Sequence, residues 1–268
     1  MKFTIITVSF NAADNIAETI NSVLSQSYND IEYIIIDGGS TDGTAEIIRQ
    51  YDGDIAYWIS EPDNGIYDAM NKGLAKSHGN YILFLNAGDT FFNNEVLTNV
   101  YDEIQFSAPN MPDVIYGETV GKTDDGYYVI ESHPQPFKED IGCCHQSILV
   151  RGDIIRKEKF NTKYRLRADF DLMHRLYLNK RYSFRHINKY ISIYDCYGAS
   201  SSLKHMHLMR REQLDILGKK FSYPSFIIWL AKNSIYLIKT QFLPYIIRQH
   251  LKDSPKIMSL ADIRQIAD

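Results

Sequence analysis

Cysteine is scarce in this sequence. The 268 residues include three cysteines, of which Cys143 and Cys144 are adjacent and Cys196 stands alone. They form no CxxC pair and are too few for a disulfide framework. Such sparse cysteine is typical of a reducing compartment. The sequence therefore predicts a cytoplasmic protein in which the adjacent pair serves as buried packing.

Long apolar segments are also absent. No stretch reaches the roughly 18 uncharged apolar residues of a membrane-spanning helix, so none is predicted. The opening segment, MKFTIITVSFNAAD, is too short and too rich in β-branched residues for a signal peptide. The net charge is −4, with acids and bases interspersed, which gives no indication of a nucleic-acid partner.

Two common nucleotide-binding motifs are missing as well. No GxGxxG follows the first apolar segment, and GxxxxGK[ST] does not occur anywhere. The first motif binds a dinucleotide and the second forms a P-loop. Their absence argues against both classes of protein.

What the sequence does contain is an alternation of strand and helix patterns over its first hundred residues. Apolar strands are expected at residues 3–10, 31–36, 55–59 and 81–85. Between them we expect a helix capped by Asp14 or Asn15, a short helix around residues 47–48, and a helix over residues 66–77. Strands separated by helices of this length are typical of βαβ units. The first half therefore predicts an α/β fold with a mostly parallel sheet, covered on both faces.

The pattern changes from about residue 113. Strands are expected at residues 113–117, 127–131 and 147–150, a helix at 169–178, and an extended segment at 182–197. From about residue 203 we expect helices to the end, broken near Pro224, Pro244 and Pro255. The predicted organisation is one domain over residues 1–215, with halves at about 1–110 and 111–215, and a helical extension over residues 216–268.

Polar residues follow three of the predicted strands at the point where each strand ends. They are Ser9, Asn11 and Asp14 after the first strand, Asp37 and two glycines after the second, and Asn86 and Asp89 after the fourth. Singly, each is explained by folding alone, because Asn, Gly and Asp are common in turns. Ligands bind beyond the carboxyl ends of the strands in open parallel sheets. Together these residues therefore predict one ligand site.

The chemistry of the two acids indicates the ligand. Asp37 can accept a hydrogen bond from a nucleobase N–H or a ribose hydroxyl, and the glycines after it let a ligand approach the backbone. Asp89 suits Mg²⁺ or Mn²⁺, which take one or two carboxylates and complete their coordination with phosphate oxygens and water. A base-contacting acid and a metal-binding acid on one rim predict a nucleoside diphosphate.

Three segments resemble those of the family 2 glycosyltransferases of the GT-A fold. They are TVSFNAADNIAETINSVLSQSY, IIIDGGSTDGT and EPDNGIYDAMNKGLAKSHGNYILFLNAGD, in this order. Within the family, the sequence is similar to bacterial enzymes that build capsule, O-antigen and colanic-acid-type polysaccharides, and the resemblance covers about residues 1–200. It implies a Rossmann-like, mixed and mostly parallel sheet flanked by helices. It also implies inverting transfer of a hexosyl or N-acetylhexosaminyl group from a nucleotide sugar, above all a UDP-sugar, to a saccharide, aided by Mg²⁺ or Mn²⁺.

The resemblance implies roles for residues at the strand ends. Asp37 corresponds to the acid that contacts the nucleobase, and Ser9 and Asn11 correspond to the loop around the base and ribose. The segment from Asn86 to Asp89 corresponds to the metal-binding Asp-x-Asp-type motif. Only Asp89 is acidic there, which predicts weak metal binding without the donor and leaves loss of metal dependence as an alternative.

The helix before the fourth strand carries three more residues that are expected to contact the donor or the acceptor. Asn71 and Lys72 are expected at the nucleotide sugar, with Lys72 paired to the diphosphate. The alternative for Lys72 is a salt bridge with Asp68 one helical turn earlier. Tyr67 is expected to stack or hydrogen-bond near the substrates, and its alternative is a core position.

The second half supplies the implied acceptor side. Asp169 corresponds to the catalytic base of a Glu-Asp helix start in which Ala168 replaces the Glu, and an inverting transfer needs a carboxylate to take the acceptor proton. Asp171 is interpreted as structural. The alternative for both acids is favourable placement at a helix N-terminus. His145 and Gln146 are expected to contact the acceptor or the diphosphate.

The last fifty residues lie outside the resemblance. Aromatic and aliphatic clusters at residues 226–231, 235–238 and 242–247 are interspersed with Lys232, Lys239, Arg248 and Lys252. This mixture predicts helices at the inner face of a bacterial plasma membrane, close to a lipid-linked saccharide acceptor. The alternative is that the extension packs on the catalytic domain or on a second copy of the chain in a homo-oligomer.

Two rival functions remain from the sequence. A sugar nucleotidyltransferase shares a similar fold, but it needs a Gly-rich loop with basic residues after the first strand, and SFNAADN is neither. The second rival is a nucleotide-sugar-binding protein without transfer activity, because the segment that corresponds to the metal-binding motif has Asp89 as its only acidic residue. Donor hydrolysis or transfer separates the enzyme from the binder.

Overall fold

The computed structural model of the chain describes residues 1–106, 109–132, 136–196, 205–237 and 257–267. The chain divides into two compact units, Met1–Val120 with Glu131–Tyr194, and Gly121–Ile130 with Asp195–Asp268. Every residue predicted for the site belongs to the first unit. The predicted domain boundary at residue 215 stays a prediction.

Four parallel strands form the first half of the sheet, in the order β3-β2-β1-β4. They are β1 (Phe3–Ser9), β2 (Ile31–Asp37), β3 (Tyr57–Ser60) and β4 (Tyr81–Phe84). All residues of β1 and β4 are buried, as expected of parallel strands that are covered on both faces. The four strands confirm the predicted α/β alternation, although β3 begins two residues later than expected.

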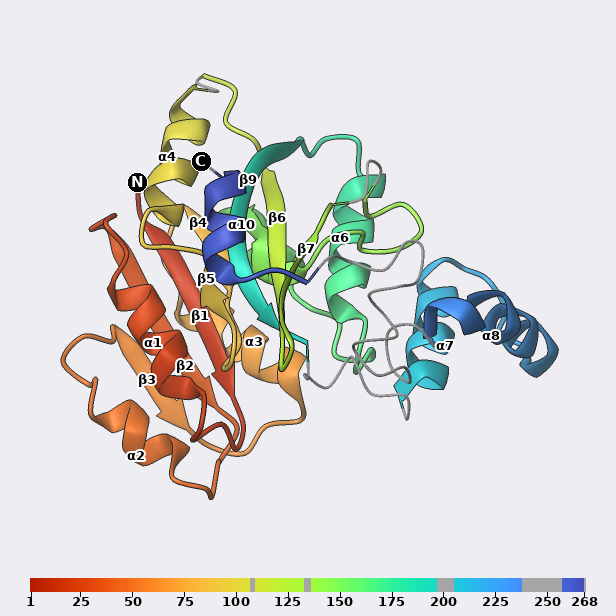
Figure 1. Cartoon of the computed structure of the whole chain (residues 1–268), viewed down its shortest axis with the longest axis horizontal. Coiled ribbons are helices and arrows are strands. Elements are labelled where there is room, and N and C mark those ends of the chain that lie inside the picture. Colours follow the sequence, from red (N-terminus) through yellow and green to blue (C-terminus); the bar gives the residue numbers. More distant parts are fainter. Residues whose placement is uncertain (107–108, 133–135, 197–204, 238–256, 268) are drawn as a thin grey trace. The chain divides into compact units, whose positions relative to one another are not determined.

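Helices α1 (Ile16–Leu24), α2 (Thr44–Arg49) and α3 (Ile66–Lys76) connect these strands. The chain adds β2 and then β3 on one side of β1, and it then adds β4 on the other side of β1. Because such crossovers are right-handed, the outward and returning connections lie on opposite faces. Figure 1 accordingly shows α1 and α2 on one side of the strands and α3 on the other. The reversal of strand order between β1 and β4 marks the rim where ligands bind in such sheets.

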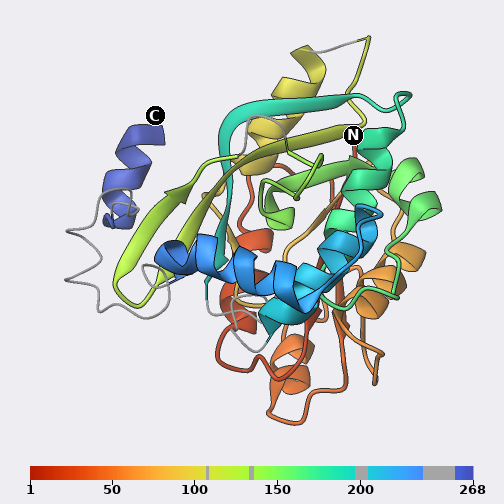
Figure 2. The same cartoon turned by 90° about the vertical axis from the view of Figure 1, so that its right-hand side faces the viewer.

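Antiparallel strands complete the sheet. β8 (Ile148–Arg151) lies beside β4, β6 (Val114–Thr123) beside β8, and β9 (Phe184–Asp195) between β6 and the short β5 (Thr90–Phe91). Figure 2 shows β6 in yellow-green and β9 in teal as the long strands of this half. The mixed sheet flanked by helices confirms the predicted fold class.

Several local features differ from the sequence prediction. Helices α4 (Val96–Phe106) and α5 (Gly152–Glu158) and strand β5 were not expected. Asn15 stands at the N-cap of α1, one of the two positions expected, but its side chain makes no capping hydrogen bond. The strand expected from residue 147 begins at Ile148, because the 3₁₀ turn η1 (His145–Ser147) precedes it.

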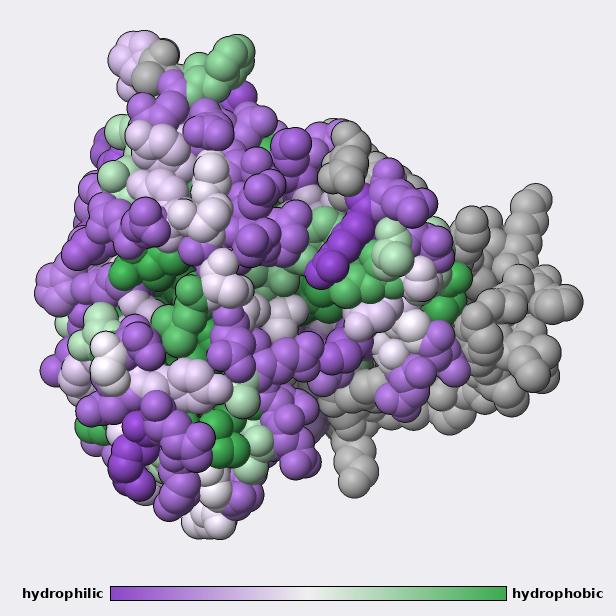
Figure 3. Space-filling view, turned by 60° about the vertical axis from the view of Figure 1, so that its left-hand side comes forward, coloured by the Kyte–Doolittle hydropathy of each residue, from purple (hydrophilic) through white to green (hydrophobic). Residues whose placement is uncertain are grey.

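Helix α6 (Ala168–Leu178) confirms the helix expected at residues 169–178. None of the three cysteines, which all lie in the described ranges, is in a disulfide. Cys143 is buried and Cys144 is half-buried, so the expected burial of the adjacent pair is confirmed for Cys143 alone. The face drawn in Figure 3 is largely hydrophilic, and its apolar residues form separate patches.

The second unit contains β7 (Gly126–Ile130), which pairs with β6, and helices α7 (Met206–Ile216), α8 (Tyr223–Leu237) and α10 (Leu260–Ala267). The backbone of Met258 exchanges two hydrogen bonds with Tyr127 of β7, and Ile263 of α10 is fully buried. The helical character of the C-terminal extension is thus confirmed where the chain is described.

The break expected near Pro224 is confirmed, because α7 ends at Ile216 and α8 begins at Tyr223. Pro224 lies in the first turn of α8, where a missing N–H costs nothing. The expected breaks at Pro244 and Pro255 lie outside the described residues. Among the helices of the described ranges, none is long and apolar enough to cross a membrane.

Candidate active site

The carboxylate of Asp37 joins three strand ends. It lies at the end of β2, is fully buried, and accepts hydrogen bonds from Ser9 Oγ at 2.8 Å and Ser60 Oγ at 2.6 Å. Ser40 donates two more, from its N–H at 2.9 Å and its Oγ at 2.5 Å. Burial opposes ionisation, but these hydrogen bonds outweigh it and lower the pKa of Asp37. Asp37 therefore braces β1, β2 and β3, and its predicted contact with a nucleobase stays a prediction.

The loop after β1 is fixed to the loop after β2. Asn11 has a left-handed backbone with φ 49°, its N–H donates to Ser40 Oγ at 2.7 Å, and its side-chain oxygen accepts from Thr41 N–H at 3.0 Å. Ser9 is buried and its hydroxyl donates to Asp37. Ser9 and the exposed Asn11 thus both join the loops at the strand ends, and their predicted contacts with the nucleotide stay predictions.

Lys72 holds the loop after β3. Its ammonium lies 2.7 Å from Glu61 Oε1 and donates to the carbonyl of Pro62 at 3.1 Å. The alternative salt bridge with Asp68 is not formed; Asp68 Oδ2 accepts the N–H of Asn64 at 3.0 Å. Pairing of Lys72 with a diphosphate remains a prediction.

Asp89 lies in a tight turn at the carboxyl end of β4. Its side chain is 3% exposed, and Oδ2 accepts a hydrogen bond from Gln146 Nε2 at 2.8 Å. Gly88 has φ 99°, and Thr19 Oγ1 donates to the carbonyl of Asp89 at 2.8 Å. The turn lies beside the end of β1, because Ala87 N–H donates to the carbonyl of Val8 at 3.1 Å.

Asn86, in the same turn, contacts His145. The side-chain nitrogen of Asn86 lies 3.1 Å from His145 Nε2, and Asn86 Oδ1 is buried with no hydrogen-bond partner among the described residues. His145 and Gln146 of η1 therefore connect the β4 turn to the second half of the first unit.

The turn offers ligand atoms of the type that a divalent cation prefers, but too few of them to bind the cation without a donor. The unpartnered Asn86 carbonyl and the Asp89 carboxylate are oxygen donors of the type Mg²⁺ or Mn²⁺ prefers. The described residues hold no group of three or more His, Cys, Asp or Glu side chains that could bind a metal. A cation here would have to take its remaining ligands from phosphate and water.

Three elements converge on Asp169, at the start of α6. The hydroxyl of Tyr67, in the first turn of α3, donates to Oδ1 at 3.0 Å, and the N–H of Phe170 donates to the same oxygen at 2.8 Å. His145 Nδ1 lies 3.6 Å from Oδ2. Burial and the Asp169 charge raise the pKa of Tyr67 well above its usual value, which keeps the phenol a neutral donor. Burial lowers the pKa of His145, and Asp169 opposes this effect.

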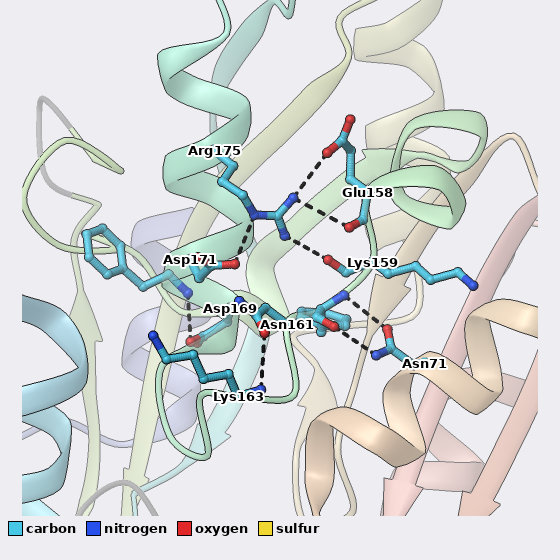
Figure 4. A network of polar contacts seen from close by, with 10 residues as sticks. Asn71, Glu158, Lys159, Asn161, Lys163, Asp169, Asp171 and Arg175 are labelled. Carbon is cyan, nitrogen blue, oxygen red and sulfur yellow. Dashed lines mark hydrogen bonds and ion pairs between the residues drawn. The ribbon is translucent and has the colours of Figure 1, made fainter. Parts of the chain in front are cut away.

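Asp171 is structural, as interpreted from the sequence. Its Oδ2 accepts from Arg175 Nε at 2.9 Å, one helical turn later. Arg175 also contacts Glu158 Oε2 at 3.1 Å and the carbonyl of Lys159 at 2.8 Å (Figure 4). This network secures α6 to the end of α5.

Asn71 has a similar bracing role. Its side-chain nitrogen donates to the carbonyl of Phe160 at 2.9 Å, and its side-chain oxygen accepts from the N–H of Phe160 at 3.0 Å. Figure 4 shows Asn71 beside the chain segment that follows α5. Both amide groups are thereby used, and the predicted contact of Asn71 with a nucleotide sugar stays a prediction.

A cleft of about 400 Å³ opens beside Tyr67. It is lined by the first turn of α3 and by the segment before α6, including Asn64, Tyr67, Asp68, Thr162, Tyr164 and Arg165. The tyrosine that donates to Asp169 is thus also a wall of the cleft. Sequence reasoning missed Tyr164 and Arg165, because neither residue follows a strand or belongs to a motif.

The chain is similar to several known glycosyltransferases. The family model described as glycosyl transferase family 2 matches residues 4–215. A PGL/p-HBAD biosynthesis glycosyltransferase of Mycobacterium tuberculosis is 28% identical over 206 residues, which cover 75% of this chain and 79% of that protein. The Bacillus subtilis protein named "Putative teichuronic acid biosynthesis glycosyltransferase TuaG" is 43% identical over 88 residues, covering 32% of this chain and 35% of that protein.

Two solved structures show the same fold. The structure of S. aureus TarS 1-349 in complex with UDP-GlcNAc matches with a TM-score of 0.64 and 18% identity, covering 91% of this chain and 76% of that chain. The second structure is the mannosyltransferase PcManGT of Pyrobaculum calidifontis in complex with GDP-Man and Mn²⁺. It matches with a TM-score of 0.58 and 14% identity, covering 90% of this chain and 70% of that chain. The predicted GT-A fold is confirmed by these likenesses, and the family match over most of the chain shows that the protein belongs to glycosyl transferase family 2.

Proposed function

We propose that this protein transfers a sugar from a nucleotide sugar to a saccharide hydroxyl, with Asp169 as the general base. The observation that carries the proposal is the convergence of Tyr67, His145 and Phe170 N–H on one carboxylate at the start of α6. Structural neighbours are in complex with UDP-GlcNAc or GDP-Man, which supports a nucleotide sugar as the donor. A UDP-sugar is the first candidate for that donor.

The two oxygens of Asp169 have different surroundings. Oδ1 accepts hydrogen bonds from Tyr67 and from Phe170 N–H, whereas Oδ2 accepts no hydrogen bond from the described residues and has the His145 ring 3.6 Å away. Oδ2 is therefore the oxygen that takes the acceptor proton. As it does so, the hydroxyl oxygen bonds to the anomeric carbon, the bond from that carbon to the diphosphate breaks, and the nucleoside diphosphate leaves with the electron pair. Attack opposite the leaving group inverts the anomeric configuration.

Asp89 and the carbonyl of Asn86 are the residues that would hold a divalent cation against the diphosphate. When bound, Mg²⁺ or Mn²⁺ supplies positive charge that stabilises the leaving group. The Mn²⁺ named with the Pyrobaculum mannosyltransferase supports this assignment. Gln146 keeps the Asp89 carboxylate oriented, and His145 does the same for the Asn86 amide.

The acceptor would enter through the cleft beside Tyr67. Aromatic and polar side chains together, such as Tyr164 with Thr162 and Arg165, suit a saccharide. The relatives named for PGL/p-HBAD and teichuronic acid biosynthesis support a bacterial surface glycolipid or polysaccharide as the product class. A lipid-linked saccharide is the proposed acceptor.

Helix α8 is the proposed membrane contact. Tyr223, Ile227 and Ile228 are 66%, 63% and 56% exposed, an unusual amount of apolar surface for one helix. Such a helix suits the interface of an anionic membrane. The protein would then act as a peripheral protein at the cytoplasmic face of the bacterial plasma membrane. The apolar cluster at 242–247 and the bases Lys239, Arg248 and Lys252 lie outside the described residues.

The test begins with thermal unfolding of the full-length protein in the presence of Mn²⁺ and UDP-, GDP- or dTDP-sugars, because native-state binding raises the midpoint. The stabilising donor is then incubated with lipid-linked saccharides. We expect labelled sugar in the lipid fraction and a nucleoside diphosphate in solution. Stabilisation without transfer or donor hydrolysis would indicate a binding protein. Release of pyrophosphate from a nucleoside triphosphate and a sugar phosphate would indicate a nucleotidyltransferase.

A further inference from the structure

We propose that the acceptor is an anionic saccharide, one that carries a carboxylate or phosphate group, and that Lys163 and Arg165 bind this group at the cleft beside Tyr67. The inference rests on the proposed function, because it assumes that this cleft receives the acceptor. It states which class of saccharide the cleft selects.

Positive charge is concentrated in one segment of the chain. Residues 151–189 contain twelve lysines and arginines but four aspartates and glutamates, a net charge of +8, whereas the whole chain carries −4. The remaining residues therefore carry −12. Such an uneven distribution creates a local positive potential, which attracts an anionic ligand to this part of the surface.

The part of this segment that is richest in bases forms a wall of the cleft. Residues 159–168 include no acid and four bases, which are Lys159, Lys163, Arg165 and Arg167. Thr162, Tyr164 and Arg165 line the cleft, and the ammonium of Lys163 lies 5.1 Å from the centre of the Tyr164 ring. The wall therefore carries positive charge at two successive points of the chain.

The four bases differ in their surroundings. Arg167 Nη1 pairs with Asp140 Oδ1 at 2.5 Å, so the charge of this arginine is balanced within the protein. Figure 4 shows the side chains of Lys159 and Lys163 extending in opposite directions from the segment after α5. Lys163 and Arg165 are both exposed, and they are the bases that a ligand in the cleft can reach.

Asp68 is the one acid among the residues that line the cleft. It belongs to the first turn of α3, where its Oδ2 accepts the N–H of Asn64 at 3.0 Å. Negative charge is favoured at this end of a helix, so Asp68 serves the helix start. The two charges of Lys163 and Arg165 exceed this single negative charge.

The bases are carried by a fixed segment of backbone. The ring of Phe160 packs against Tyr67 with 5.4 Å between centroids, and the backbone of Phe160 exchanges two hydrogen bonds with the Asn71 side chain. Tyr164 is buried, and its N–H donates to the carbonyl of Asn161 at 3.1 Å. Binding to a segment that is already ordered costs little conformational entropy, which favours a specific ligand site.

This wall suits an acidic saccharide better than a lipid headgroup. Residues 162–165 are Thr, Lys, Tyr and Arg, so none of the four is aliphatic. A membrane-binding surface inserts apolar side chains beside its bases, whereas a saccharide is bound by hydroxyl, aromatic and charged groups. The guanidinium of Arg165 can form two parallel hydrogen bonds to a carboxylate or phosphate, and the ammonium of Lys163 adds a point charge.

Calorimetry of the full-length protein with two matched pairs of probes tests the proposal. The first pair is an oligogalacturonate and its carboxyl-reduced counterpart, and the second pair is mannose 6-phosphate and mannose. The two pairs distinguish a carboxylate from a phosphate. We expect at least one charged probe to bind about tenfold or more tightly than its neutral partner, the scale of a hydrogen bond to a charged group. Added salt should reduce this preference.

Arg165→Gln should remove most of the preference for the charged probe and leave the affinity for the neutral probe unchanged. Lys163→Gln should reduce the preference by a smaller factor, because an ammonium lacks the paired geometry of a guanidinium. Both residues are exposed, so both variants should unfold at the wild-type temperature. Lys180→Gln is the matched control, since Lys180 is an exposed base of the same segment beyond the end of α6, and it should keep the wild-type preference.

Equal wild-type affinities within both pairs of probes overturn the inference. An equal loss in Arg165→Gln and Lys180→Gln also overturns it, because a diffuse basic surface would then bind the probe. Weaker sedimentation of Arg165→Gln with anionic vesicles, at unchanged probe affinity, would assign the base to the membrane instead and reject the inference.

The proposed function fails separately from the inference. A protein that binds the charged probe but neither binds a nucleotide sugar nor transfers from one would keep the anion site and lose the transferase. Transfer to neutral saccharides as fast as to acidic ones would keep the transferase and overturn the inference.

Discussion

The hydroxyl of Tyr67 lies 3.0 Å from Oδ1 of Asp169, which joins the first turns of two helices across 102 residues of sequence. The phenol is buried and neutral, so it acts as a fixed donor that holds one carboxylate oxygen. It also lines the cleft proposed for the acceptor. One side chain therefore positions the proposed base and borders the substrate.

Replacing Asp169 with Asn should leave donor affinity near the wild-type value and slow transfer by about 10²–10⁴-fold, the usual contribution of a general base. Steady-state transfer rates and calorimetry measure the two quantities. Asp171→Asn is the control: it loses the Arg175 contact and should lower stability while the folded enzyme retains its turnover. Normal transfer by Asp169→Asn together with failed transfer by Asp171→Asn would show that the base is the other carboxylate.

Tyr67→Phe should reduce kcat by about 10-fold to 100-fold with little change in the KM for the donor. The ring stays in place, and the loss corresponds to one hydrogen bond to a charged group, about 1.5–3 kcal/mol. Tyr177→Phe removes a hydroxyl from the same helix as Asp169, and it should have no effect on kcat. Equal rates for Tyr67→Phe and the wild type would remove Tyr67 from the proposed positioning role.

Asp89→Asn should abolish stimulation by Mn²⁺ without unfolding the protein, because Asn keeps the size of the side chain and an acceptor for Gln146. Since the turn offers a single carboxylate, calorimetry should detect Mn²⁺ binding to the wild type only when a nucleoside diphosphate is present. Chelation of the metal should remove the same fraction of activity as the substitution. Tight Mn²⁺ binding by the protein alone would contradict the shared coordination.

Asp37→Asn should lower the free energy of unfolding at pH 7 by about 1–3 kcal/mol, since buried donors lose an acceptor. The pKa of Asp37 is lower in the folded chain than its unfolded value of about 3.9, so its contribution is present above that pH. The contribution is lost as the pH falls through the folded pKa. In urea unfolding, the difference in free energy of unfolding between the wild type and Asp37→Asn should therefore decrease below about pH 4. A difference that is constant from pH 7 to pH 3 would contradict the assignment. Asp54→Asn, at an exposed residue, is the control.

Combined substitution of Ile227 and Ile228 by Glu should prevent the full-length protein from sedimenting with anionic vesicles, because both side chains are more than half exposed on α8. Added salt should weaken wild-type binding, since each base near the surface contributes about 1 kcal/mol. Leu178→Glu, at a residue 61% exposed on α6, is the matched control and should bind like the wild type. If the wild type ignores vesicles at low salt, α8 is a packing or oligomerisation surface instead.

The strands of the parallel half and the rim at their ends were predictable from the sequence. A strand that is covered on both faces of the sheet needs apolar side chains at consecutive positions, as in β1 and β4. This pattern can be recognised within the strand's own segment of sequence. Polar residues directly after such runs, including Asp37 and Asp89, must then lie at one edge. The placement of Asp169 came from the resemblance of a helix start rather than from its pattern.

By itself, the sequence determined the alternation of strands and helices, because periodicity and turn residues act within a few positions. It also determined which polar residues reach the carboxyl edge of the sheet. Only the tertiary structure decided what each of them does there. Four donors from three strand ends bind the Asp37 carboxylate, Lys72 holds the loop after β3, and Tyr67 meets Asp169. These contacts join residues distant in the chain, and hydrogen bonding depends on atomic distance, which the packing of the sheet and helices sets.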